Sequence, residues 1–250
     1  MKHRKLIFRP CNAPLIVYEH PEPDTQYTVG VDTSGGVGLD YSVFSVLSNR
    51  MPFEQVAIWR SNKIRPAAAA EQLAELGWYY NNALMTVESN AIGAGLLDVL
   101  VHTHRYSRVY RKEEQLDTDP SVSDKLGYAT TQTGKYLLLA EFQQAWRDKA
   151  IILHDRTTVE EFCNYVYLKK QNWNSNLILK TGAIEGMHDD CVIATMLALH
   201  AARLYPQSPR PKTAPGPKLS ADQNQMRRML DKHMKTVVTR CSKKTPVEVM

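Results

Sequence analysis

The hydrophobic and polar positions between residues 27 and 62 follow the two-residue period of β-strands. A β-branched run, YTVGVD, is followed by the glycine-rich turn TSGGVG and then by DYSVFSVLSN, in which apolar and polar residues alternate. The segment QVAIWRSN then fits a third strand. We therefore predict a three-stranded antiparallel meander across these residues.

The pattern changes to the period of a helix after Pro66. The segment AAAAEQLAELGWYY has apolar residues at helical spacing, and the proline suits a first helical turn. ALMTVE then predicts a buried strand that ends on Glu88, residues 91–104 a second helix, and SRVYRK a further short strand. This order of strands and helices predicts a mixed α/β sheet.

The second half of the chain continues after a polar, turn-rich loop at residues 112–133. KYLLLAEFQQAW predicts a helix and AIILHD a strand, and Thr157 or Thr158 is placed to cap a helix that runs to Tyr165. A hairpin-like segment precedes a closing helix from about Asp189 to Leu204. We divide the chain into an extended lead-in (1–26), one α/β domain (27–205), a proline-rich linker (206–219) and a basic tail with a short helix (220–250).

Charge is unevenly distributed along the chain. The formal net charge is +5, but residues 206–250 hold ten Lys/Arg and three Asp/Glu (+7), which leaves 21 basic and 23 acidic groups (−2) in residues 1–205. The tail is therefore a candidate contact for nucleic acid or a partner, although a flexible, solvated extension has the same composition.

Four scattered cysteines without a CxxC pair argue against a zinc site or a disulfide framework. No apolar run is long enough for a membrane span, and the N-terminus lacks a secretory apolar region.

Acidic residues stand at the ends of two predicted strands and at the start of the closing helix. Asp32 ends YTVGVD, Glu88 ends ALMTVE, and Asp189 and Asp190 open an apolar helix. Carboxylates that converge are hard oxygen ligands for Mg²⁺ or Mn²⁺, and two such ions activate a water and stabilise the leaving oxygen of a phosphodiester. Taken singly, Asp32 has an ordinary interpretation as a turn former, and Asp189 or Asp190 as a helix cap.

Four segments resemble, in the same order, the motifs of the nuclease domain of tailed-phage large terminase subunits. They are VGVDTSGGVGLDYS, TVESNAIGAGLLDVL, GYATTQTGKYLLLAEF with its Gly-x-x-Thr…Thr-x-Lys pattern, and the His-Asp-Asp helix GMHDDCVIATMLAL. The resemblance implies a ribonuclease-H-like fold, with a mixed central β-sheet flanked by helices. It also implies a divalent-metal-dependent endonuclease that cuts double-stranded phage DNA concatemers during genome packaging.

The same resemblance implies roles for individual residues at a metal centre and on the DNA. The expected ligands of two Mg²⁺ or Mn²⁺ ions are Asp32, Glu88, Asp189 and Asp190, with Asp40 as an optional ligand. The expected DNA contacts are Lys135, Thr131, Thr133 and His188. The sequence leaves open which of the two adjacent aspartates binds metal. His188 could also be an ordinary surface residue. Thr131, Thr133 and Lys135 could also belong to an ordinary capped helix start.

Family members usually carry an N-terminal packaging ATPase with a Walker A motif, and no GxxxxGK[ST] occurs in this sequence. We interpret the lead-in (1–26) as the linker side of a missing ATPase. The resemblance further implies the portal or procapsid and the small terminase subunit as partners of the tail, no membrane partner, and the host cell cytoplasm as the location.

Two other classes of function fit parts of the sequence. In an actin- or sugar-kinase-like ATP-binding protein, VGVDTSGGVG would cradle phosphates, but GAIEGMHDD is a poor second phosphate loop. A non-catalytic module would bind DNA or an assembly partner through the basic tail. That interpretation predicts that Asp32→Ala and Glu88→Ala leave all activity unchanged.

Overall fold

The computed structural model describes residues 14–111, 126–171, 177–208 and residue 228, and within them the predicted meander is confirmed. Strands β2 (Tyr27–Asp32), β3 (Ser42–Ser48) and β4 (Phe53–Ser61) pair antiparallel in sequence order. Their residues are almost all buried because the sheet is covered on both faces.

Three short strands complete the sheet. Strand β5 (Leu84–Val87) pairs parallel with β2, while β1 (Leu15–Val17) and β6 (Ile151–Ile152) both pair with β4, antiparallel and parallel respectively. The strand order is β1-β4-β3-β2-β5, with β6 also paired to β4. Because two of these pairings are parallel and the others antiparallel, the sheet is mixed, as predicted. Because β2 and β5 are parallel, Asp32 and Glu88 lie at the same edge of the sheet.

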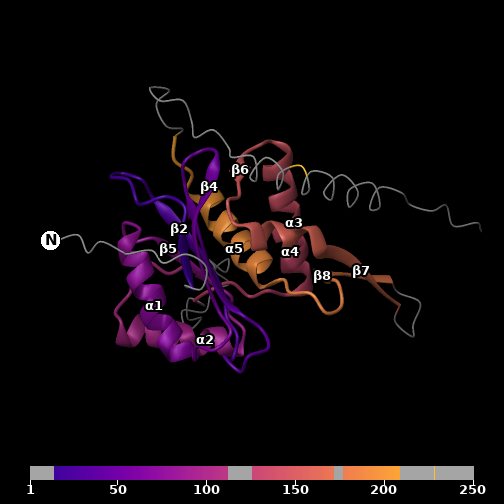
Figure 1. Ribbon diagram of the computed structural model, residues 1–250, viewed down its shortest axis with the longest axis horizontal. Helices are drawn as coiled ribbons and strands as arrows, with labels where there is room; N and C mark the ends of the chain where they lie inside the picture. Colours follow the sequence, from indigo (N-terminus) through magenta and orange to yellow (C-terminus); the bar gives the residue numbers. More distant parts are fainter. Residues whose placement is uncertain (1–13, 112–125, 172–176, 209–227, 229–250) are drawn as a thin grey trace, which may run out of the picture.

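Helices cover both faces of the sheet (Figure 1). One face packs against α1 (Pro66–Tyr79) and α2 (Ala91–Asp98), which continues into the π-helical turn η1 (Val99–Thr103). The other face carries α3 (Gln132–Arg147), α4 (Arg156–Asn164) and α5 (Asp190–Leu204). A separate hairpin, β7 (Tyr165–Gln171) with β8 (Leu177–Ala183), projects beside α3 and α4.

Helix α5 packs directly onto β2, and Gly30 is the residue that allows it. A Cβ atom at position 30 would lie 1.9 Å from the carbonyl oxygen of Ala194 and 2.4 Å from the backbone nitrogen of Ala198. Thr28, two residues away on the same face, donates its hydroxyl to the carbonyl of Ala198 at 3.0 Å. The strand that ends in Asp32 and the helix that begins at Asp190 are thereby held in fixed register.

Several predicted elements differ in detail from the structure. Residues around SRVYRK make backbone bonds to Met85 and isolated bridges rather than a strand, and β6 has two residues instead of six. Helix α4 is capped by the side chain of Asp155, which accepts from Thr158 N–H, so the predicted threonine cap is wrong. Aspartate is a better N-cap than threonine, and Asp155 stands two residues before Thr157 and three before Thr158.

The expected tail helix lies outside the described residues, apart from the exposed helical residue Arg228. None of the described helices is long and apolar enough to cross a bilayer. Of the four cysteines, Cys191 is buried and Cys163 half-buried, and both are free thiols.

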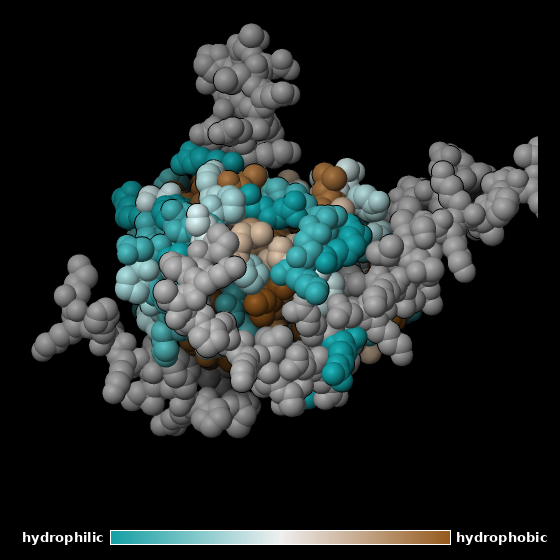
Figure 2. Space-filling model, turned by 90° about the horizontal axis from the view of Figure 1, so that it is seen from above, coloured by the Kyte–Doolittle hydropathy of each residue, from teal (hydrophilic) through white to brown (hydrophobic). Residues whose placement is uncertain are grey.

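Where described residues are visible in Figure 2, the surface is mostly hydrophilic with a few apolar residues between them. This is expected, because most apolar side chains form the two main clusters inside the domain.

Candidate metal centre

Three elements bring carboxylates together at one edge of the sheet. Asp32 ends β2, Glu88 follows β5 with its backbone N–H bonded to Val31 O at 2.9 Å, and Asp190 is the first residue of α5. The Asp32 and Glu88 side chains lie close enough for the Glu88 carboxylate to act on the pKa of Asp32. Burial, then the Glu88 charge and hydrogen bond, then the Asp190 charge raise the pKa of Asp32 well above its usual range, and the ammonium of Lys135 opposes them.

The Glu88 side chain is held through both of its oxygens. Asn90 Nδ2 donates to Oε2 at 3.0 Å, and the Thr130 hydroxyl donates to Oε1. Asn90 also caps α2, because its Oδ1 accepts from Gly93 N–H at 2.8 Å. A Cβ atom on Gly93 would lie 1.8 Å from the Glu88 carbonyl oxygen, so only glycine lets the helix start this close to the strand end.

Asp190 is the member of the aspartate pair that faces the other carboxylates. It is 8% exposed and contributes to the raised pKa of Asp32, whereas Asp189 is the partly exposed N-cap residue of α5. The backbone N–H of Tyr41 donates to Asp190 Oδ2 at 3.2 Å. Burial raises the pKa of Asp190; the Tyr41 hydrogen bond and His188 lower it, and the charges of Asp189 and Asp40 raise it.

The remaining predicted residues lie around this cluster. His188 is exposed, with Nδ1 3.5 Å from Asp190 Oδ2. Asp40 is exposed in the loop before β3 rather than on the strand itself. Thr131 is the N-cap of α3, with its hydroxyl accepting from Gly134 N–H at 3.0 Å, and Thr133 is exposed in the first turn. Lys135, one turn into α3, places its positive charge beside Asp32.

The donor set is made of carboxylate oxygens, which suit hard divalent cations. A divalent cation at this edge would offset the like charge of Glu88 and Asp190 that raises the pKa of Asp32. Within the described ranges, no three His, Cys, Asp or Glu side chains are arranged so that they could hold a metal ion as they stand. The fit to a divalent metal rests on the donor atoms and on the sheet edge that the carboxylates share, and not on a preformed ligand cage.

Comparison with known proteins identifies the family of the domain. Residues 29–202 match the family model described as the terminase RNaseH-like domain. The chain belongs to this family. Its fold is that of the ribonuclease-H-like terminase domains, with the mixed sheet flanked by helices that the sequence predicted.

Solved structures of terminase nucleases share the family fold. The large terminase nuclease from thermophilic phage G20c with bound cobalt is 20% identical, with a TM-score of 0.60 and coverage of 76% of this chain and 88% of that one. The magnesium-bound form of the same nuclease is 18% identical with a TM-score of 0.60 and the same coverage. The large terminase nuclease domain of Thermus phage P74-26 is 20% identical over 75% of this chain and 85% of that one, with a TM-score of 0.57.

Four residues around the carboxylates had no predicted role at the metal centre. Thr130 and Asn90 donate to Glu88, Glu161 accepts from the backbone N–H of Cys191 next to Asp190, and Arg60 pairs with Glu161. Glu161 had a detectable signal, because it falls three residues after Thr158 on the stripe of α4 that is buried. A carboxylate on a buried helical stripe requires a partner. Thr130 and Asn90 stand within the quoted Gly-x-x-Thr and TVESN motifs, which marked their segments but not their contacts with Glu88. Arg60 gave no signal, because its partner is distant in sequence.

Proposed function

We propose that this domain is a divalent-metal-dependent endonuclease that cuts double-stranded phage DNA concatemers during genome packaging. The observation that carries the proposal is the convergence of Asp32, Glu88 and Asp190 at one sheet edge. The related G20c nuclease has been solved with cobalt, magnesium and zinc, which supports a divalent ion at the corresponding edge. We propose that the site holds two ions of Mg²⁺ or Mn²⁺.

Asp32, Glu88 and Asp190 would hold the ions, and Asp189 and Asp40, whose charges act on Asp190, are the further candidate ligands. Two bound ions would supply an activated water and stabilise the leaving 3′ oxygen of the phosphodiester. Asn90 and Thr130 keep both Glu88 oxygens oriented. His188 lies where it would orient Asp190 or meet a phosphate, and Lys135 would meet a phosphate as metal neutralises the carboxylates. Thr131 and Thr133, at the start of α3, are the proposed contacts to the DNA backbone.

The same electrostatics disfavour an ATP-binding function. The glycine-rich turn after Asp32 would have to receive phosphates beside three carboxylates, and the segment GAIEGMHDD, which runs from the end of β8 through a loop to the first residue of α5, itself carries three acidic residues. We propose the portal or procapsid and the small terminase subunit as partners of the C-terminal tail, and the host cell cytoplasm as the place of action.

The test is cleavage of supercoiled plasmid by the full chain. With Mn²⁺ or Mg²⁺ the protein should nick and linearise the plasmid, and chelation with EDTA should stop the reaction. Asp32→Asn and Glu88→Gln should each remove cleavage while circular dichroism shows an intact fold. Cleavage retained by the protein carrying both substitutions would contradict the metal assignment, and ATP-dependent activity without cleavage would favour the other enzyme class.

A further inference from the structure

Glu161 lies behind the candidate metal centre and contacts the first turn of α5. It is 6% exposed, and its Oε2 accepts from the backbone N–H of Cys191 at 2.7 Å. Cys191 follows Asp190 directly, so this bond holds the helix end that carries the carboxylate. A negative side chain also interacts favourably with the positive end of the helix dipole. Glu161 comes from α4, so its contact ties two helices together at the site.

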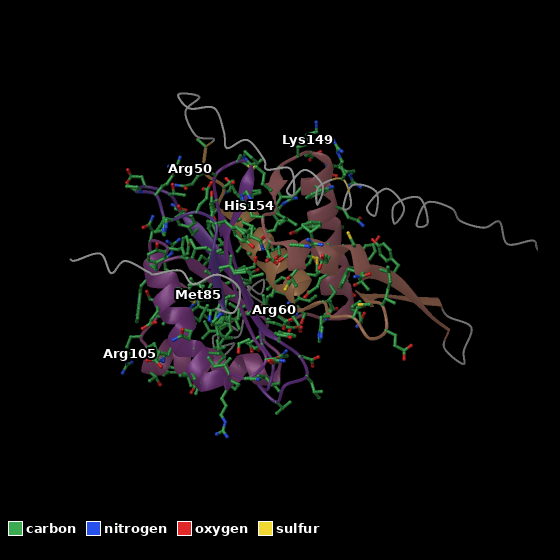
Figure 3. All side chains as sticks on the ribbon, viewed as in Figure 1. Arg50, Arg60, Met85, Arg105, Lys149 and His154 are labelled. Carbon is green, nitrogen blue, oxygen red and sulfur yellow. The ribbon has the colours of Figure 1, made fainter. Side chains whose placement is uncertain are left out.

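Arg60 connects Glu161 to the other support of Asp190. Its guanidinium NH2 lies 3.6 Å from Glu161 Oε1, and its Cζ lies 3.7 Å above the ring of Tyr41. Tyr41 in turn donates its backbone N–H to Asp190 Oδ2 at 3.2 Å. Figure 3 labels Arg60 at the end of the sheet where α5 begins. Asp190 is thus held from one side through α5 and from the other through Tyr41, with the Glu161–Arg60 pair joining the two.

We infer that Glu161 and Arg60 are positioning residues that set the metal affinity of the site through Asp190. The inference rests on the proposed metal centre. A partly buried ion pair contributes little net stability, so the main consequence of the Glu161–Arg60 pair is the orientation of the groups it joins. The Arg60 guanidinium, 3.6 Å from Glu161 Oε1, also offsets the negative charge that Glu161 adds near the carboxylate cluster. Partners that orient a ligand in this way typically change metal affinity by about 10–100-fold.

The experiment measures Mn²⁺ binding to the full chain by electron paramagnetic resonance of free Mn²⁺, without DNA. Glu161→Gln keeps the shape but removes the charge that Cys191 N–H and Arg60 face, and the Kd for Mn²⁺ should rise about 10-fold. Arg60→Met should give a rise in the same direction, because Tyr41 loses the guanidinium that packs on it, and Arg60→Lys, which keeps the charge but not the planar stack, should give a smaller rise. At saturating Mn²⁺ the cleavage rate of Glu161→Gln should return to about the wild-type value, since metal occupancy is what has changed.

The neighbour Glu160 supplies a matched control. It is on the same helix, exposed, and paired with Arg156 at 2.8 Å, so Glu160→Gln should leave the Mn²⁺ Kd unchanged. If Glu161→Gln lowers the melting temperature but binds Mn²⁺ as tightly as the wild type, the residue is merely structural and the inference is wrong. If Glu161→Gln does not fold, unchanged Mn²⁺ binding by Arg60→Met would overturn it equally.

The outcome separates this inference from the proposed function. A wild-type protein that binds Mn²⁺, cuts no DNA and loses affinity with Glu161→Gln would refute the endonuclease and support the positioning role. A wild-type protein that cuts DNA while the variant keeps its Kd would support the endonuclease alone. A wild-type protein that binds no Mn²⁺ would overturn both.

Discussion

Burial and neighbouring negative charge both act on the pKa of Asp32. Its pKa is raised above its ordinary value of 3.8, first by burial and then by Glu88 and Asp190. A carboxyl group whose pKa is higher in the folded than in the unfolded state holds its proton more tightly when folded. Its contribution to stability is therefore full at low pH and is lost as pH rises from about that ordinary value through the raised folded pKa. At neutral pH without metal, the carboxylate cluster consequently lowers the stability of the domain.

We expect Asp32→Asn to stabilise the metal-free protein although it removes cleavage. The amide cannot ionise, so the repulsion between position 32 and the Glu88 and Asp190 carboxylates is removed. The melting temperature at pH 8 in EDTA should rise by a few degrees, given that ~1 kcal/mol shifts a domain of this size by ~2–4 °C. Differential scanning calorimetry across pH 5–8 checks this, and the difference from wild type should grow with pH. The exposed Asp98→Asn is the control, and an equal rise there would refute the argument.

Thr130 is the residue where a hydroxyl decides the orientation of a carboxylate. Its hydroxyl donates to Glu88 Oε1, so Thr130→Val leaves that oxygen without its donor, whereas Thr130→Ser keeps it. We expect Thr130→Val to raise the Mn²⁺ concentration for half-maximal plasmid cleavage by about 10-fold, and Thr130→Ser to stay near wild type. The exposed Thr103→Val controls for loss of a hydroxyl elsewhere. Equal behaviour of the valine and serine variants would show that Thr130 acts only through packing.

The sequence pattern predicted the acidic residues that end strands or begin a helix at the site. It did not predict the contacts that residues distant in sequence make with them. Asp32, Glu88 and the Asp189–Asp190 pair carry a local signal, because each follows or precedes a strongly apolar run. The choice of Asp190 over Asp189 depends on how α5 is rotated against β2, which the helical pattern alone leaves open because both positions precede apolar residues. Thr130 meets Glu88 across 42 positions of sequence through a turn, so no periodicity points to it.

At the scale of elements, the contact of α5 with β2 determines the geometry of the centre. Gly30→Ala would place a methyl group 1.9 Å from the Ala194 carbonyl, so the helix must move. We expect a loss of about 1–3 kcal/mol in the free energy of unfolding. Because α5 carries Asp190, cleavage should fall by about 100-fold, as expected for a displacement of ~1 Å at a reacting centre. Urea denaturation and the plasmid assay measure the two effects.

The control for this prediction is a glycine that nothing crowds. Gly95 is exposed in α2, and a Cβ atom there has no neighbour within 4 Å. Gly95→Ala should therefore stabilise the protein by about 0.5–1 kcal/mol through helix propensity and leave cleavage unchanged. If both alanine variants lose stability to the same extent, the close approach of α5 to β2 is not the cause.

Long periodic elements were predictable from the pattern, and most of the short ones were not. The meander, α1 and α5 have strong two- or 3.6-residue periods, and the structure has them close to the predicted bounds. The short strand β5 was predictable from its apolar run instead. AIILHD predicts a strand of six residues, but only Ile151 and Ile152 pair with β4, because the chain then turns to place Asp155 as the cap of α4. Tertiary contacts determine where such short strands end, and the local sequence pattern carries no information about those contacts.

At the scale of the whole molecule, negative and positive charge are separated. Residues 1–205 have a net charge of −2 and include the carboxylate cluster, while residues 206–250 have a net charge of +7. Without metal, the cluster repels DNA phosphates, and bound divalent ions reverse the local sign. The basic tail supplies attraction that acts over about 8 Å at physiological salt and is independent of the metal. Affinity for DNA and cleavage of DNA are therefore expected to depend on different parts of the chain.

Deletion of residues 209–250 tests this separation. Each phosphate that the tail neutralises adds about 0.9 to the slope of log affinity against log salt, so the shortened chain should show a shallower slope and weaker binding at 150 mM salt. Its cleavage rate at saturating DNA, low salt and saturating Mn²⁺ should match that of the full chain, because the carboxylates lie in the remaining part. Fluorescence anisotropy of a labelled duplex gives the slope, and single-turnover cleavage gives the rate. An unchanged slope would place the phosphate contacts on the folded domain, where Lys135 is the first residue to substitute.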